Sequence, residues 1–128
     1  MGNVNSRTIG SGANLFRAGT IRGEARWFEN PADVVAVDED DLPNLVAFVG
    51  KGGMTFLSPI LAELKGVVCT AGSLESHLAI LAREFEIPCV MGAQLDGKIA
   101  NGDEVVLDLE GDTTGQILVM AADEGGTA

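Results

Sequence analysis

The chain has 128 residues, a formal net charge of −11 at pH 7 and 46% hydrophobic residues, which suits one domain with its own core. This charge excludes a nucleic-acid-binding protein, because phosphate backbones are bound by clustered lysines and arginines. Eight basic against nineteen acidic residues also argue that the chain does not itself hold ATP. Its apolar runs are too short to span a membrane and it shows no signal peptide, so we expect a cytoplasmic location.

The two cysteines, Cys69 and Cys89, lie twenty residues apart in apolar, strand-like contexts. They form no C-x-x-C pair, so we expect two reduced thiols in the core of a cytosolic protein. A zinc site made of both cysteines and His77 is disfavoured, because the spacing matches no standard ligand pattern. We therefore expect no metal.

In chain order, the first part of the sequence predicts mostly strands. Residues 1–13 are polar and rich in glycine, and we expect a flexible N-terminus there. A strand is predicted over Thr20–Phe28, and short strands over Asp33–Val37 and Leu45–Val49. The acidic block at 38–41 is interpreted as a solvated loop, with a docking patch for a basic partner surface as the alternative.

The second part of the sequence alternates strands with helices. A short helix is predicted from Ser58, with Pro59 at its favoured first position. The strands expected here are Gly66–Thr70, Ile87–Met91, Val105–Asp108 and Gln116–Val119, the last two as a closing pair. Residues 121–128 are expected to form a flexible tail, which leaves 14–120 as the folded domain.

A second helix is predicted over Ser76–Phe85, because its apolar residues recur on one face. These residues, at i, i+3, i+4 and i+7, are Leu78, Leu81, Ala82 and Phe85. His77, the only histidine, lies off this face in the first turn, where solvent or a partner reaches it. The unpaired N–H groups and dipole at a helix start favour a neutral, nucleophilic imidazole and a phosphate on it. His77 is thus a candidate phosphoryl carrier, with a structural or capping role as the alternative.

The segment around the histidine reads GSLESHLAILAREFEIPCVMG. It resembles the swivelling phosphohistidine domain of the PEP-utilising enzymes, with the pattern G-[GS]-x-x-[SC]-H-x-A-I-x-A-R-E-x-x-I-P-x-V-x-G. The residues that match in register are Gly72, Ser73, Ser76, His77, Ala79, Ile80, Ala82, Arg83, Glu84, Ile87, Pro88, Val90 and Gly92. Segments within 18–25, 58–68 and 101–115 also resemble the family, so the likeness runs from Ala18 to Val119.

The resemblance implies an α/β fold, the swivelling β/β/α phosphohistidine domain, as a single compact domain. In this family the mobile domain shuttles between two active sites: ATP phosphorylates the histidine at one, and the phosphoryl group passes to an acceptor at the other. The ATP-grasp and acceptor-binding domains are absent from this chain. We therefore expect a stand-alone small subunit that works with an ATP-grasp subunit, which binds ATP and Mg²⁺, and an acceptor-binding subunit or domain. No nucleic-acid or membrane partner is expected.

Hypothetical roles follow for the matching residues. His77 is the phosphoryl carrier and transient nucleophile, and Gly72 and Ser73 let the backbone approach the phosphate closely. Ser76 either donates its hydroxyl to a phosphoryl oxygen or caps the helix. Arg83 has a supporting role, either pairing with an acid that fixes the helix or meeting the partner.

Glu75 departs from the family pattern, in which many members have threonine and others leucine. A carboxylate beside a phosphoryl acceptor repels the phosphate, but it also offers a hydrogen bond to the other ring nitrogen and so orients the imidazole. An exposed bystander acid is the third interpretation. The sequence leaves all three open.

The family includes pyruvate phosphate dikinase, PEP synthase, rifampin phosphotransferase and phenylphosphate synthase. The leading hypothesis is a subunit of a dikinase-type phosphotransferase that splits ATP to AMP and phosphate. Split systems of this kind resemble phenylphosphate synthase, so a phenolic hydroxyl is the favoured acceptor, and pyruvate remains open. The alternatives are a non-enzymatic phosphocarrier or regulator phosphorylated on His77, and a degenerate docking module that has lost its chemistry.

Overall fold

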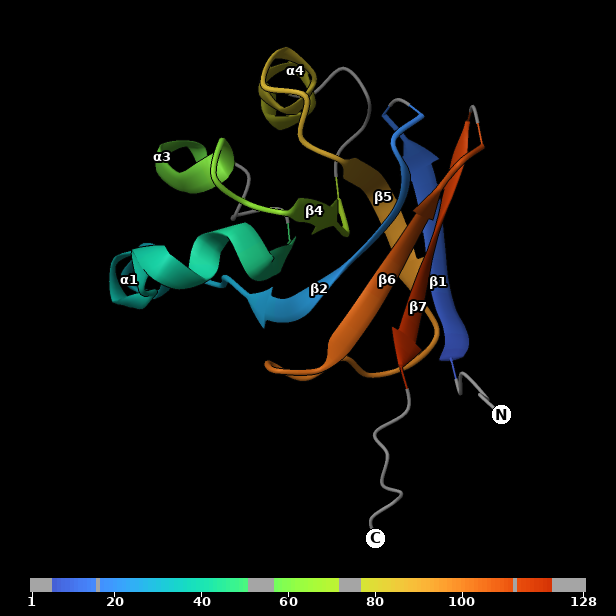
Figure 1. The fold of residues 1–128 in the computed structure, drawn as a ribbon, viewed down its shortest axis with the longest axis horizontal. Helices are drawn as coiled ribbons and strands as arrows, with labels where there is room; N and C mark the ends of the chain where they lie inside the picture. The colour runs from blue at the N-terminus through green and yellow to red at the C-terminus, as the bar shows by residue number, and fades with distance from the viewer. Residues whose placement is uncertain (1–5, 16, 51–56, 72–76, 112, 121–128) are drawn as a thin grey trace, which may run out of the picture.

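In its described residues, the computed structural model is a closed β-barrel with helices on one side (Figure 1). The residues described are 6–15, 17–50, 57–71, 77–111 and 113–120. The strands are β1 (Ser6–Asn14), β2 (Gly19–Trp27), β3 (Leu45–Val49), β4 (Gly66–Cys69), β5 (Cys89–Leu95), β6 (Glu104–Leu109) and β7 (Thr114–Met120). They follow one another around the barrel in the order β1-β5-β4-β3-β2-β6-β7, and β7 closes onto β1.

The barrel has a parallel side and an antiparallel side. Strands β2, β3, β4 and β5 pair in parallel, whereas β1, β6 and β7 make antiparallel pairs. Parallel neighbours need crossover connections, and these carry α1 (Pro31–Ala36), the 3-10 helix η1 (Glu39–Asn44), α3 (Ser58–Leu61) and α4 (His77–Glu84). The helices cover the outside of the parallel side (Figure 1). The prediction of a single α/β domain of the swivelling β/β/α kind is confirmed.

Strand β3 separates two hydrophobic cores. All five of its residues are buried, and they alternate between the two faces of the sheet, as the period of two in a strand requires. Val46 and Phe48 join the core inside the barrel, while Ala47 and Val49 join the core beneath the helices. The continuous apolar run in this strand therefore reflects burial on both faces, which is typical of parallel sheets.

The predicted flexible N-terminus is wrong for the part that the structure describes. Residues 6–14 form β1, which pairs with both β5 and β7 and so closes the barrel. The segment is polar and has only one large apolar side chain in its middle, Ile9, which is 2% exposed. Its order comes from backbone pairing with strands far away in the sequence, and local hydrophobic periodicity does not report such pairing.

The strand predicted over Asp33–Val37 is also wrong, because this segment forms α1. Pro31 occupies the first turn of the helix, where its missing N–H costs nothing. The Asp33 carboxylate accepts hydrogen bonds from the backbone N–H of Glu29 at 2.8 Å and of Asn30 at 3.3 Å. These bonds satisfy donors at the helix start, and this local chemistry outweighs the β-propensity of the two valines that follow. The acidic block at 38–41 is exposed and begins η1 instead of a loop.

Asn14 ties the closing hairpin to the end of β1. It is 2% exposed, and its Nδ2 donates to the carbonyl oxygens of Leu109 and Gly111 at 3.2 and 2.7 Å. These two acceptors lie at the end of β6 and in the turn that follows. The buried amide thus holds the β6–β7 hairpin against β1 through hydrogen bonds with little competition from water.

The close approach of β1 to β5 generates a testable prediction. A Cβ placed on Gly12 would lie 2.7 Å from the carbonyl oxygen of Met91 and 2.9 Å from the Cα of Ala93. Both are backbone atoms of β5, so the strands must move apart to accommodate it. We expect Gly12→Ala to lower the free energy of unfolding by about 1–3 kcal/mol in urea denaturation.

Gly97→Ala is the matched control. Its Cβ would meet Ile9 Cγ2 at 3.5 Å, an ordinary contact, so the change should stay within about 0.5 kcal/mol. Equal effects of the two substitutions would show that the β1–β5 approach is not the constraint described above.

Candidate functional site

The carboxyl ends of the parallel strands meet at one edge of the barrel, which we call the carboxyl edge. The register places Trp27 of β2 beside Phe48 of β3, and Val49 of β3 beside Cys69 of β4. Thr70 continues the pairing by donating its N–H to the Val49 carbonyl oxygen at 2.9 Å. In α/β sheets, ligands bind outside the carboxyl ends of the strands. The chain leaves β4 at this edge and leads to α4.

His77 is the first residue of α4, and its side chain is exposed. The helix is held to the domain by Leu78, Ala79 and Ala82, which are fully buried in the core beneath the helices. Because these residues occupy the inner face, the imidazole is turned outward at the helix N-terminus. An imidazole in this place is accessible to a partner, and the positive end of the helix dipole favours negative charge on it.

The apolar face of α4 differs from the prediction at one position. Phe85 was expected to face the core, but it follows the last helical residue and is 46% exposed. Leu81 is partly buried against the core, and Ala79 takes a fully buried place. Arg83 is exposed in the last turn, where a positive charge complements the negative end of the helix dipole.

Four of the predicted site residues lie outside the described part of the chain. They are Gly72, Ser73, Glu75 and Ser76. The roles assigned to them, cradling the phosphate, orienting the imidazole and donating to a phosphoryl oxygen, therefore stay predictions. These four residues belong to the connection between β4, which ends at the carboxyl edge, and His77, which begins α4.

The two cysteines are buried free thiols in the core beneath the helices. The Cys69 thiol donates to the carbonyl oxygen of Ala71 at 2.9 Å, and burial raises its pKa. Burial, together with the proximity of the Cys69 thiol, raises the pKa of the Cys89 thiol to about 12. Both groups are therefore protonated at neutral pH, which makes them poor nucleophiles and poor metal ligands.

The described residues contain no group of three or more histidine, cysteine, aspartate or glutamate side chains placed to hold a metal ion. None of the helices formed by these residues is both long and apolar enough to cross a membrane.

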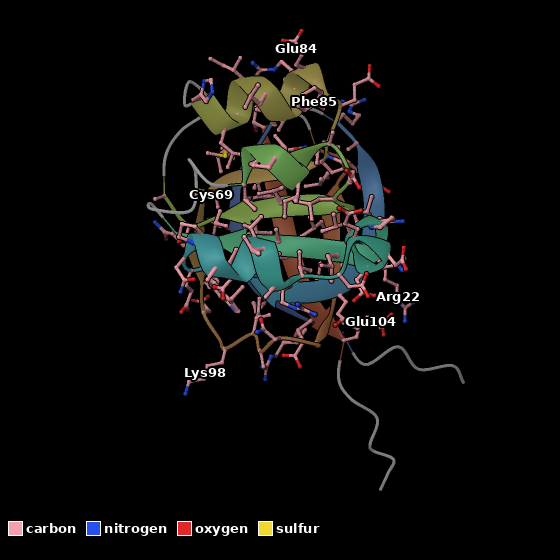
Figure 2. The ribbon with its side chains drawn as sticks, turned by 90° about the vertical axis from the view of Figure 1, so that its left-hand side faces the viewer. Arg22, Cys69, Glu84, Phe85, Lys98 and Glu104 are labelled. Carbon is pink, nitrogen blue, oxygen red and sulfur yellow. The ribbon has the colours of Figure 1, made fainter. Side chains whose placement is uncertain are left out.

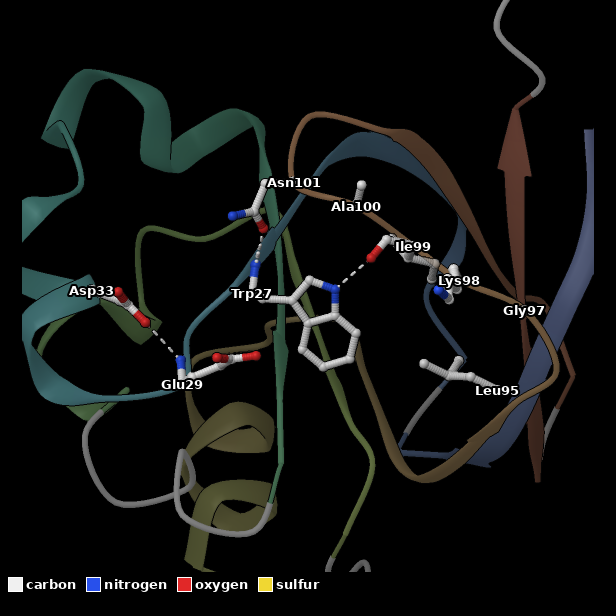
Figure 3. A pocket seen from close by; sticks show the side chains of 9 residues that line it. All are labelled: Trp27, Glu29, Asp33, Leu95, Gly97, Lys98, Ile99, Ala100 and Asn101. Atoms are coloured by element: carbon white, nitrogen blue, oxygen red, sulfur yellow. Dashed lines mark hydrogen bonds between the residues drawn. The ribbon is translucent and has the colours of Figure 1, made fainter.

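A cavity that the sequence did not indicate lies beside Trp27 (Figure 3). It has a volume of about 690 Å³ and is lined by Trp27, Glu29, Asp33, Leu95, Gly97, Lys98, Ile99, Ala100 and Asn101. These residues come from the end of β2, the start of α1 and the connection between β5 and β6. The signal in the sequence is that Trp27 is the single tryptophan of the chain and is the next-to-last residue of a predicted strand.

The comparison with protein families identifies the domain. Residues 30–111 match the family model of the PEP-utilising enzyme, mobile domain. The chain belongs to this family. The match includes His77 and the parallel strands β3 and β4, which agrees with the resemblance seen in the sequence. A mobile domain of this family works with catalytic domains and carries no nucleotide site of its own.

Individual relatives agree with the family assignment. The chain is 36% identical over 93 residues to chondramide synthase of Chondromyces crocatus, covering 72% of this chain and 2% of that protein. It is 34% identical over 77 residues to rifampicin phosphotransferase of Bacillus cereus, covering 60% of this chain and 8% of that enzyme. The mobile domain thus spans less than a tenth of either relative, and it is related to phosphotransferases.

Among solved structures, an MccF-like protein from Bacillus anthracis superposes with a TM-score of 0.60. The superposition covers 88% of this chain and 43% of that chain at 11% identity. At this identity the likeness concerns the fold alone.

The raised pKa of the Cys89 thiol predicts a pH dependence of stability. Between the ordinary thiol value of 9.0 and about 12, the unfolded chain loses this proton while the folded domain keeps it. The free energy of unfolding should therefore fall as pH rises through this window, by up to about 1.4 kcal/mol per pH unit from this group. Cys89→Ala removes that contribution, so its stability curve should be flatter than that of the wild type.

Urea denaturation at several pH values from 8 to about 10.5, in the presence of a reductant, measures both curves. Curves that stay parallel over this range would show that the Cys89 thiol is not held protonated by burial.

Proposed function

We propose that this domain is a phosphohistidine carrier, the small subunit of a split dikinase-type phosphotransferase. His77 takes a phosphoryl group from ATP on a separate ATP-grasp subunit and passes it to a small-molecule acceptor. The observation that carries the proposal is an exposed imidazole at the first residue of α4 in a chain of the mobile-domain family. The proposed location is the cytoplasm.

The chemistry assigned to this chain is a double displacement at phosphorus. A neutral imidazole nitrogen of His77 attacks the β-phosphorus of ATP, so that a P–N bond forms as the P–O bond to the α-phosphate breaks and AMP leaves. Water then cleaves the remaining phosphoanhydride bond, which releases phosphate and leaves one phosphoryl group on the histidine. The acceptor oxygen then attacks the phosphohistidine, the P–N bond breaks, and the acceptor proton passes to a base or solvent. Overall, ATP, water and the acceptor give AMP, phosphate and the phosphorylated acceptor. The N-terminus of α4 stabilises the phosphoryl charge between the two steps.

The proposed acceptor is a small organic molecule that is phosphorylated on an oxygen atom. We favour a phenolic hydroxyl, from the likeness to phenylphosphate synthase, and pyruvate is the second choice. Two relatives are rifampicin phosphotransferases, which supports a small organic acceptor for this chain as well.

The acidic charge of the chain supports a carrier that docks onto separate catalytic subunits. The net charge of −11 suits repeated docking onto the cationic clefts in which nucleotides bind, and such docking weakens as salt is added. ATP and Mg²⁺ belong to the partner subunit in this scheme, and this chain supplies the imidazole.

The first test is phosphorylation of His77. Wild-type protein incubated with ATP, Mg²⁺ and native cell extract, and kept alkaline, should gain one acid-labile phosphoryl group in intact-mass measurements. His77→Ala should gain none. Because the side chain is exposed, this variant should unfold within about 0.5 kcal/mol of the wild type.

A label that persists in His77→Ala would contradict the proposal. Where the label is lost with the histidine, formation of AMP and a phosphorylated acceptor separates the enzyme subunit from a carrier that only signals.

Glu75→Thr tests the departure from the family pattern. If the carboxylate repels the phosphoryl group, the labelling rate should rise, by roughly tenfold for about 1.4 kcal/mol of relieved repulsion. If it orients the imidazole, the rate should fall by a similar factor. An unchanged rate, measured by quenched-flow labelling, would identify Glu75 as a bystander.

A further inference from the structure

The indole of Trp27 is held as a fixed platform at the carboxyl edge. Its Nε1–H donates to the carbonyl oxygen of Ile99 at 2.7 Å, and its backbone N–H donates to Asn101 Oδ1 at 2.7 Å. The ring packs against Phe48, with ring centroids 5.3 Å apart. The polar edge of the indole is thus satisfied and its orientation is fixed. Figure 3 shows the ring nearly face-on among the residues that line the cavity.

The surroundings of this platform favour a cation. Figure 3 shows the Glu29 side chain extending toward the indole from one side of the cavity, with Leu95 and Lys98 on the other. Within the described part of the chain, no hydrogen bond or ion pair engages the Glu29 carboxylate. The Asp33 carboxylate, in contrast, is occupied by two backbone N–H groups. A positive group over an indole beside a free carboxylate gains from both interactions.

We propose that this cavity binds an arginine side chain of the catalytic partner protein. A guanidinium is planar, so it stacks on the indole while its N–H groups reach the Glu29 carboxylate, a combination that a lysine ammonium does not match. The net charge of −11 further favours a basic partner surface, and tryptophan is prominent among residues that dominate protein interfaces.

The position of the cavity fits such a contact. Trp27 ends β2 and Cys69 ends β4 at the same carboxyl edge, and the chain leaves this edge toward His77. In Figure 2, Cys69 and Lys98 lie toward one side of the barrel, and the Arg22–Glu104 ion pair lies toward the other. A partner that approaches this edge has the cavity within its footprint. The identity of the partner rests on the proposed function, whereas binding of the arginine group does not.

Trp27 itself reports binding, because the chain has one tryptophan and no tyrosine. The probe is the peptide acetyl-Gly-Arg-Gly-amide, titrated at low ionic strength and followed by tryptophan emission and by the single indole N–H signal in NMR spectra. We expect a saturable change. The same peptide with citrulline, which has nearly the same shape but no charge, should bind at least about fivefold more weakly.

Three variants test the assignment of charges, each first checked for a native spectrum. Glu29→Gln should weaken binding about fivefold, whereas Glu63→Gln, which removes an equal charge from an exposed site outside the cavity, should change it less than about twofold. Lys98→Gln should strengthen binding, because it removes the one basic residue among those lining the cavity.

The proposal is overturned if the arginine peptide causes no saturable change, or if the citrulline peptide binds equally well. If Glu29→Gln and Glu63→Gln weaken peptide binding equally, the peptide is held by the overall negative charge of the protein and not by the cavity, which also overturns the proposal. Weaker binding of the peptide to Lys98→Gln would mean that Lys98 holds the carbonyl groups of the peptide instead of repelling its charge, and would overturn the assignment of charges. No ATP is present in this titration, so its failure leaves the phosphorylation of His77 untouched, and a failure to label His77 leaves the titration interpretable.

Discussion

The parallel pairing of β3 with β2 and β4 is the constraint on which the rest of the structure depends. A strand buried on both faces needs a core on each side of it. Val46 and Phe48 help to fill the barrel, and Ala47 and Val49 help to hold the helices. Backbone hydrogen bonds to two neighbours satisfy its polar groups away from water. Removing either core would expose one face of β3, so barrel and helices stabilise each other.

Parallel pairing also determines where the candidate functional residue His77 lies. Each crossover returns the chain to the opposite end of the sheet, so the carboxyl ends of β2, β3 and β4 gather at one edge. The helix that follows β4 begins with His77, and its inner face is anchored by Leu78, Ala79 and Ala82. The imidazole is thereby exposed on a rigid element. The proposed carrier function requires this combination of accessibility and fixed orientation.

The antiparallel strands close the barrel. β1, β6 and β7 complete the barrel and remove its free edges, which would otherwise invite pairing with other chains. Closure depends on the absence of side chains at Gly12, where β1 approaches the backbone of β5, and on the amide of Asn14. The chain is acidic, and the cavity at Trp27 combines an aromatic face with a carboxylate, so both long-range and local features of this domain favour a basic partner.

The sequence by itself determined the family, the position of the histidine and the most hydrophobic strands. The segment around His77 is a dense local pattern, and β3 and β4 are continuous apolar runs, so both are read without knowledge of distant contacts. The closing pair β6–β7 was found for the same reason. Helix α1 differs from the predicted strand because Pro31 and the Asp33 carboxylate favour a helix start, against the β-propensity of the valines that follow.

Only the tertiary structure decided the features that rest on contacts between distant residues. β1 has little hydrophobic pattern and exists because β5 and β7 pair with it. Phe85 follows the helical period but lies past the end of α4, where the core no longer reaches it. The platform at Trp27 needs the carbonyl of Ile99 and the amide of Asn101, more than seventy residues away. Periodicity reports how neighbours along the chain share a face, whereas these features depend on which surfaces meet after folding.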